Sequence, residues 1–271
     1  QGGRVGASRP RSSWEPLGGR RALPRARGVT SVARLGGGWS RLQARSVAGV
    51  RPVATGPPGG SLALSEGAVS RETAARLDLY VDLLRKWQER INLVASSSLE
   101  QVWHRHILDC GQLAALAPAA NRWLDIGSGA GLPGLIVALL NRRPEFGMIL
   151  VESNRKKGSF LLEAIRATGA PATLFPGRAE TIFSEIDGGS IDIITARAVA
   201  SLSSLCDLVA PGMAQGAQAL FLKGRGIDAE LTEAAISWRI EADLLPSLSD
   251  PEGRVVRMRS LAPRHSASPK V

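Results

Sequence analysis

From residue 122 onward, short apolar runs alternate with segments long enough to form helices. The first five runs are apolar throughout, as strands are when helices cover both faces of a parallel sheet. Only residues 246–254 separate the last two runs, and a connection that short favours an antiparallel pair. We therefore predict an α/β fold with a doubly wound, seven-stranded, mostly parallel sheet. The predicted strands are 122–126, 148–152, 172–175, 191–195, 219–223, 240–245 and 255–260.

Two helical stretches precede the first predicted strand. Between residues 72 and 91 the apolar side chains recur at helical spacing, and Ser70 is suited to cap the N-terminus of that helix. A second helix is predicted over 99–116. We divide the chain into an extension at 1–60, an N-terminal helical part at 61–120, a sheet domain at 121–262 and a flexible tail at 263–271.

Residues 1–60 carry the whole net charge of the chain. They contain 11 Arg, no Lys and one acidic residue, so their charge of +10 equals that of all 271 residues. They also contain 13 Gly and 6 Pro, a content typical of disordered segments. We predict a disordered extension and leave its origin open between a solvated tail or overlong gene start, an organellar transit peptide and a polyphosphate-binding arm.

Several classes of protein do not fit the sequence. No run of 18 apolar residues occurs, so we expect no membrane span. The two cysteines, Cys110 and Cys206, offer no disulfide framework and suit a reducing compartment, so the expected location is the cytoplasm. His104 and His106 would point away from each other on a helix, and no Cys/His cluster completes a metal site.

The first predicted strand runs into the loop WLDIGSGAGLPG, with Gly127, Gly129 and Gly131 at every second position. Such glycines let a ligand approach main-chain N–H groups, and ligands bind at this edge of open α/β sheets. A phosphate-binding Walker loop would end in Gly-Lys-Ser/Thr, and a dinucleotide fingerprint would have glycine where Leu132 stands. The GxGxG spacing is instead the form used by S-adenosylmethionine-dependent methyltransferases, although a plain strand–helix turn has the same composition.

A carboxylate, Glu152, ends the second predicted strand. We expect it to accept hydrogen bonds from both ribose hydroxyls of an adenosyl ligand. The alternative is an ordinary surface acid that pairs with Arg155 or Lys156.

Further motifs occur in a fixed order along the chain. KWQERINL and RHILD precede the glycine loop, and VESNRKKGSFL, GRAE, ITARAVASL and FLKG follow it. Together they resemble the RsmG (GidB) family of bacterial 16S rRNA guanine-N7 methyltransferases over about residues 63–262. The resemblance implies a class I methyltransferase fold, S-adenosyl-L-methionine as cofactor, and guanine 527 of 16S rRNA or a small-subunit precursor as substrate. We expect a monomer.

The resemblance also implies roles for individual residues. Gly127 and Leu132 would contact the methionine and adenosyl portion of the cofactor, and the pair Ala179 and Glu180 would flank the adenine. Arg197 matches an arginine at the edge of the cofactor site, where a guanidinium can grip a carboxylate or a phosphate. The alternative for Arg197 is a surface arginine at a strand end.

Because the folded part has no net charge, we expect RNA to contact a basic patch at the carboxyl ends of the strands. For the lysine and arginine after the fifth strand, a solvated loop is an equal alternative. The predicted patch consists of Arg155, Lys156, Lys157, Arg197, Lys223 and Arg225.

We assign no catalytic residue, because N7 of guanine has a free lone pair and its methylation needs positioning rather than a general base. Three alternatives remain open. They are a methyltransferase of the same fold acting on another RNA, a protein or a small molecule, a non-enzymatic RNA-binding protein with a dead cofactor pocket, and an NAD-dependent oxidoreductase. The oxidoreductase is the least supported, since its third fingerprint glycine is missing.

Overall fold

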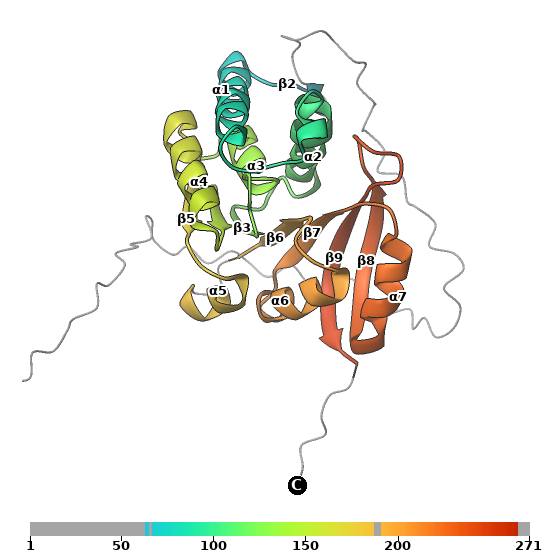
Figure 1. Cartoon of the computed structure of the whole chain (residues 1–271). Helices are drawn as coiled ribbons and strands as arrows, with labels where there is room; N and C mark the ends of the chain where they lie inside the picture. Colours follow the sequence, from blue (N-terminus) through green and yellow to red (C-terminus); the bar gives the residue numbers. More distant parts are fainter. Residues whose placement is uncertain (1–62, 65–66, 187–190, 265–271) are drawn as a thin grey trace, which may run out of the picture. The chain divides into compact units, whose positions relative to one another are not determined.

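Seven strands form one mixed sheet in the computed structural model, which describes residues 63–64, 67–186 and 191–264 (Figure 1). The strand order is β5-β4-β3-β6-β7-β9-β8, in which the first five are parallel and β9 is antiparallel to both of its neighbours. The predicted doubly wound, mostly parallel sheet is therefore confirmed. The strands are β3 Arg122–Ile126, β4 Gly147–Val151, β5 Ala172–Phe175, β6 Ile193–Arg197, β7 Gln218–Lys223, β8 Trp238–Pro246 and β9 Arg254–Pro263.

The described residues all lie within one unit of the chain, 43–271. The extension predicted at 1–60 and residues 265–271 of the predicted tail lie outside the described residues. A separate antiparallel pair, β1 (Ala63–Leu64) and β2 (Gly67–Ala68), precedes the first helix. Among the described residues, no helix combines the length and hydropathy needed to cross a membrane.

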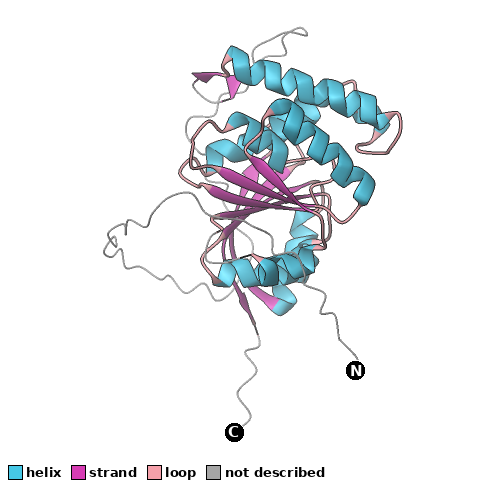
Figure 2. Cartoon of the chain, turned by 90° about the vertical axis from the view of Figure 1, so that its left-hand side faces the viewer, coloured by secondary structure: helices cyan, strands magenta, loops and turns pink. Residues whose placement is uncertain are grey.

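Helices cover both faces of the sheet (Figure 2). Successive residues of a strand point to opposite faces, so Trp123 packs in the core with α1 to α4, and Leu124 packs in the core with α5 to α7. The helices are α1 Arg71–Gln88, α2 Asp109–Leu116, α3 Gly134–Leu140, α4 Arg155–Thr168, α5 Ala179–Glu185, α6 Leu202–Ala214 and α7 Ile227–Ser237.

Helix α1 forms where the sequence predicts a helix. Ser70 is its N-cap and accepts a hydrogen bond from Thr73 N at 3.2 Å. Its apolar face packs in the core that also contains α3 and α4, so the N-terminal helical part and the sheet share one hydrophobic core. The buried Tyr80 hydroxyl donates to Ala130 O at 2.7 Å, which ties α1 to the glycine loop.

The second predicted helix, 99–116, differs from the structure. A short 3-10 turn, Ser96–Ser98, is followed by a wider π-helical segment, Trp103–Leu108, and only then by α2. Wide turns of this kind are frequent at functional sites. Arg197 contacts this segment, and its guanidinium donates to Arg105 O at 3.1 Å.

Candidate cofactor and substrate site

The glycine loop connects β3 to α3 at the carboxyl edge of the sheet. Gly127, Gly129 and Gly131 have φ angles of 65°, 55° and 80°, a region that side-chain-bearing residues rarely adopt. A methyl group at residue 131 would lie 2.7 Å from Leu135 Cβ, and one at residue 127 would lie 2.8 Å from Val199 Cγ2. The loop therefore needs glycine both for its backbone path and for its close packing.

Glu152 lies directly against this loop. Its Oε2 accepts a hydrogen bond from Gly129 N at 2.8 Å, and its Oε1 accepts one from Asn154 N at 2.7 Å. Each carboxylate oxygen has two lone pairs, so both oxygens can accept a further hydrogen bond from a ligand. The arrangement fits an adenosyl ligand, since it offers a loop without side chains at three positions beside a half-buried carboxylate.

Asp125 is a buried carboxylic acid beneath the glycine loop. It is not among the site residues predicted from the sequence. It is fully buried on β3, where Thr195 Oγ1 donates to its Oδ1 at 2.7 Å. Burial raises the pKa of Asp125 to about 6, although the hydrogen bond from Thr195 opposes the shift. Its Oδ2 has no hydrogen-bond partner among the described residues. A lone acid in the apolar run WLDI is the sequence signal that could have identified it.

Arg197, at the carboxyl end of β6, is turned toward the N-terminal helical part. Its guanidinium donates to Cys110 Sγ at 3.2 Å and to His106 Nδ1 at 3.0 Å, and it forms an ion pair with Asp109 at 3.5 Å. From the sequence we expect this residue at the edge of the cofactor site and in an RNA-binding patch. Instead of facing outward to grip a phosphate, the guanidinium is engaged by the RHILD segment, and 21% of the side chain is exposed.

The contact with Arg197 also fixes the protonation of His106. A guanidinium can only donate, so Nδ1 of His106 must be the acceptor and Nε2 carries the proton. Nε2 then donates to Ser98 Oγ at 2.8 Å, and Ser98 Oγ donates to Ala95 O at 2.6 Å. Burial, followed by the charge of Arg197, lowers the pKa of His106 to about 4, so the imidazole is neutral at pH 7.

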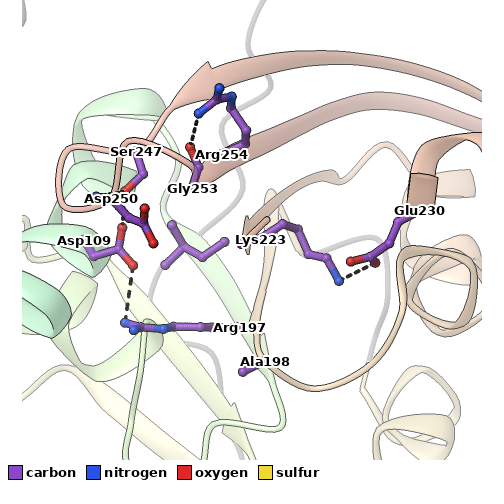
Figure 3. Close-up of a pocket in the computed structure, with 11 residues that line it drawn as sticks. Asp109, Arg197, Ala198, Lys223, Glu230, Ser247, Asp250, Gly253 and Arg254 are labelled. Atoms are coloured by element: carbon purple, nitrogen blue, oxygen red, sulfur yellow. Dashed lines mark hydrogen bonds and ion pairs between the residues drawn. The ribbon is translucent and has the colours of Figure 1, made fainter. Parts of the chain in front are cut away.

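A cavity of about 210 Å³ lies beside Arg197, at the carboxyl ends of β6 and β7 (Figure 3). The loop between β8 and β9 closes its opposite side. The cavity does not include the glycine loop or Glu152, and it reaches the neighbouring strands instead. Its lining residues are Asp109, Arg197, Ala198, Leu222, Lys223, Gly224, Glu230, Ser247, Asp250, Gly253 and Arg254.

The predicted basic patch is not a continuous exposed rim in the structure. Lys223 forms an ion pair with Glu230 at 2.6 Å, and only 9% of its side chain is exposed. Arg225 is 81% exposed, but its guanidinium is paired with Glu252. Lys223 and Arg197 are thus both engaged by protein carboxylates.

The other predicted site residues lie around the glycine loop and at the start of two helices. Arg155, Lys156 and Lys157 begin α4, where Asn154 Oδ1 accepts from the last two backbone N–H groups at 3.0 and 3.2 Å. Arg155 and Lys156 are exposed, and Lys157 is half-buried. Leu132 is buried behind the loop, whereas the pair Ala179 and Glu180 opens α5.

Glu180 and Ala179 differ in how far they reach solvent. Ala179 is half-buried, and Glu180 is exposed with a 3.5 Å ion pair to Arg178. The pKa of Glu180 is lowered by a hydrogen bond from its own backbone and by Arg178.

Within the ranges that the structure describes, no three His, Cys, Asp or Glu side chains gather as they would around a metal ion.

Two comparisons with known proteins, one with family models and one with curated proteins, agree on one family. The family described as "rRNA small subunit methyltransferase G" (GidB) matches residues 73–252. The ribosomal RNA small subunit methyltransferase G of one strain of Methylorubrum extorquens is 50% identical over 200 residues, covering 73% of this chain and 94% of that protein. Its namesake in a strain of Rhodopseudomonas palustris is 49% identical over 203 residues, covering 74% and 84%.

Among solved structures, the O-methyltransferase TomG from Streptomyces achromogenes aligns with a TM-score of 0.47 and 14% identity, covering 68% of this chain and 89% of that one. The family assignment does not depend on this weaker likeness. Because the family model matches residues 73–252 and the two relatives are about 50% identical over 200 and 203 residues, the chain belongs to the rRNA small subunit methyltransferase G family.

Proposed function

We propose that this protein transfers a methyl group from S-adenosyl-L-methionine to N7 of a guanine in small-subunit rRNA. The observation that carries the proposal is the hydrogen bond between Gly129 N and Glu152 Oε2, because it sets a carboxylate beside a side-chain-free loop. Family membership supports the rRNA substrate. Two relatives that are 50% identical over 73% of this chain are both named ribosomal RNA small subunit methyltransferase G.

The cofactor would be held by groups on β3 and β4. When bound, S-adenosyl-L-methionine supplies an electrophilic methyl group on a sulfonium. The carboxylate of Glu152 would accept hydrogen bonds from the ribose hydroxyls, and Gly127, Gly131 and Leu132 would border the rest of the ligand. Ala179 and Glu180, at the start of α5, would flank the adenine.

The rest of the chemistry requires arrangement rather than proton transfer. Guanine N7 attacks with its free lone pair, so no side chain has to remove a proton before the methyl group moves. Correct placement of two reactants can contribute about 7–11 kcal/mol to a rate. The role of the protein is then to hold the base and to exclude water, which the elements around the cavity would do.

RNA would reach this edge through exposed cations. Arg155 and Lys156, at the start of α4, are exposed beside the carboxylate of Glu152. Lys157 and Arg225 could join them, but Arg225 would first have to leave Glu252. Lys223 and Arg197 support the site from within, because both are engaged by protein carboxylates.

We also propose that the protein acts in the cytoplasm, on 16S rRNA or a small-subunit precursor, as a monomer. The four large apolar side chains exposed in the described residues come from four different segments, Leu79 in α1, Leu162 in α4, Val199 after β6 and Ile236 in α7. Such scattered residues are normal on a monomer. Sedimentation equilibrium would test the oligomeric state.

The main test is a methylation assay. Tritium from labelled cofactor should enter small-subunit rRNA taken from a strain that lacks the gene. Strand scission with borohydride and aniline should then map the label to a 7-methylguanine. Label in protein or in another RNA only, or no label at all, would overturn the proposal.

A matched pair of variants tests the cofactor site. Glu152→Gln removes the charge that strengthens hydrogen bonds to a ligand, so the affinity for S-adenosylhomocysteine should fall about tenfold or more in isothermal titration. Glu233→Gln makes the same change at an exposed position on α7 and should bind like wild type. Equal affinities for both variants would remove Glu152 from the site.

A further inference from the structure

The cavity beside Arg197 has no part in the cofactor site just described, and its position suggests what it binds. The cofactor groups lie on β3 and β4, whereas the cavity lies on β6, β7 and the β8–β9 loop. In this sheet β3 and β6 are neighbours, and the chain order reverses between them. A molecule in the cavity would therefore lie across that switch point from the cofactor.

Residues 197–199 join the cavity to the glycine loop. Arg197 and Ala198, which end β6, line the cavity. The next residue, Val199, packs over Gly127 of the glycine loop, close enough that a methyl group there would collide with it. The cavity wall and the cofactor loop thus meet at residues 197–199, and a base in the cavity could present one edge toward the glycine loop.

The volume suits a single nucleobase. At about 210 Å³ the cavity is roughly seven times the volume of about 30 Å³ that one water takes up in the liquid, which leaves room for one flat base. Charges line the space, but most of them are neutralised by the protein. Arg197 is paired with Asp109 and Lys223 with Glu230, so these four side chains are occupied with each other.

Asp250 is different from the other two carboxylates that line the cavity. Asp109 has Arg197, Gln112 and Ser247 as partners, and Glu230 has Lys223 and Leu202 N. The Asp250 carboxylate receives one hydrogen bond, from Glu252 N to Oδ1 at 2.9 Å. No ion pair joins it to a cation of the described chain, so it has unused acceptor capacity.

The loop holds Asp250 in a fixed position. Ser247 Oγ accepts from Asp250 N at 3.2 Å and donates to Asp109 Oδ1 at 2.8 Å, which anchors the loop to the RHILD segment. Gly253 N donates to Asp250 O at 3.0 Å and closes the turn. In Figure 3 the Asp250 side chain extends from this turn toward the middle of the lining residues, opposite Arg197 and Ala198.

The chemistry of guanine matches this layout. N7 lies on one edge of the base, and the donors N1–H and N2–H lie on the opposite edge. A guanine that turns N7 toward the cofactor loop must turn both donors toward the far wall of the cavity. A carboxylate accepts two such donors with its two oxygens. Adenine has an acceptor at N1, which a carboxylate would repel.

We propose that the cavity between β6, β7 and the β8–β9 loop is the guanine pocket, and that Asp250 is its specificity-determining residue, accepting hydrogen bonds from N1–H and N2–H. This inference rests on the function proposed above. It assigns a base-reading role to a residue that belongs to none of the motifs singled out in the sequence.

The test compares guanine with inosine, which lacks only the 2-amino group. Small-subunit rRNA is assembled by splinted ligation with either base at the mapped target, and kcat/KM is measured for each. Wild type should prefer guanine by about tenfold or more, which corresponds to about 1.4 kcal/mol for the lost hydrogen bond. In Asp250→Asn that preference should fall to about one, because an amide NH₂ replaces one acceptor oxygen.

Two controls separate base recognition from folding. Asn can keep the acceptor that Glu252 N needs, so Asp250→Asn should melt and bind S-adenosylhomocysteine like wild type. Glu241→Gln removes an acid from the exposed part of the same hairpin and should keep the guanine preference.

The outcomes distinguish the two proposals. If wild type methylates no guanine N7, the proposed function fails. If wild type methylates N7 but treats inosine like guanine, or if Asp250→Asn retains the wild-type preference, then only the assignment of Asp250 is overturned.

Discussion

Two glycines of the glycine loop, Gly129 and Gly131, provide a test of how backbone path and packing combine. Replacing Gly129 with alanine adds only the cost of a left-handed backbone, about 1–2 kcal/mol, because the nearest atom to the new methyl group is 3.8 Å away. Replacing Gly131 adds the same cost and also forces a methyl group within 2.7 Å of Leu135 Cβ. That carbon is attached directly to the backbone of α3 and cannot rotate away.

Overpacking of this kind costs about 1–3 kcal/mol, so Gly131→Ala should lower the free energy of unfolding by about 2–5 kcal/mol in total. Gly169→Ala is the matched control, since its φ of 59° resembles that of Gly129 and nothing lies within 4 Å. Urea denaturation with unchanged m-values gives the three free energies. If Gly131→Ala costs no more than Gly129→Ala and Gly169→Ala, the packing argument is refuted.

Three further outcomes are expected. Arg197→Gln should lower the free energy of unfolding by about 3 kcal/mol in thermal melts, because its buried partners lose their donor; an unchanged melting temperature would contradict the anchoring role. Unfolding lets His106 take up a proton below its ordinary pKa of 6.5, so stability should fall from about pH 6.5 to about pH 4, and His106→Gln should flatten that slope. Lys156→Gln with Lys157→Gln should reduce the salt dependence of RNA binding by about one unit of slope per lost phosphate contact, whereas Arg85→Gln, at an exposed residue of α1, should not.

Much of the fold could be predicted because buried parallel strands leave a direct trace in the sequence. The strands at 122–126 and 172–175 have the predicted bounds. The strand predicted at 191–195 lies at 193–197, because pairing with β7 continues through Arg197 although the apolar run has ended. Hydrophobicity marks which residues are covered, but hydrogen bonding to the neighbours decides where a strand stops.

Some features of the candidate site could likewise be predicted from the sequence, and others could not. The contact of Glu152 with the glycine loop could be predicted, because local patterns mark two adjacent parallel strands and both strands end at the same edge of the sheet. The partners of Arg197 and Lys223 do not follow, since a sequence displays each charge but not the carboxylate that folding brings to it. Asp250 escapes sequence reasoning for a related reason, because its significance lies in the absence of a cation partner in the described structure.

The hydrogen bond from Tyr80 to Ala130 has a practical consequence for making shortened versions of this protein. A version that starts at the first strand of the sheet would expose the core face of α3 and α4 and would leave the Ala130 carbonyl without its donor. Any shortened protein intended for crystallisation or ligand screening must therefore begin at or before Ser70, the residue that caps the helix carrying Tyr80.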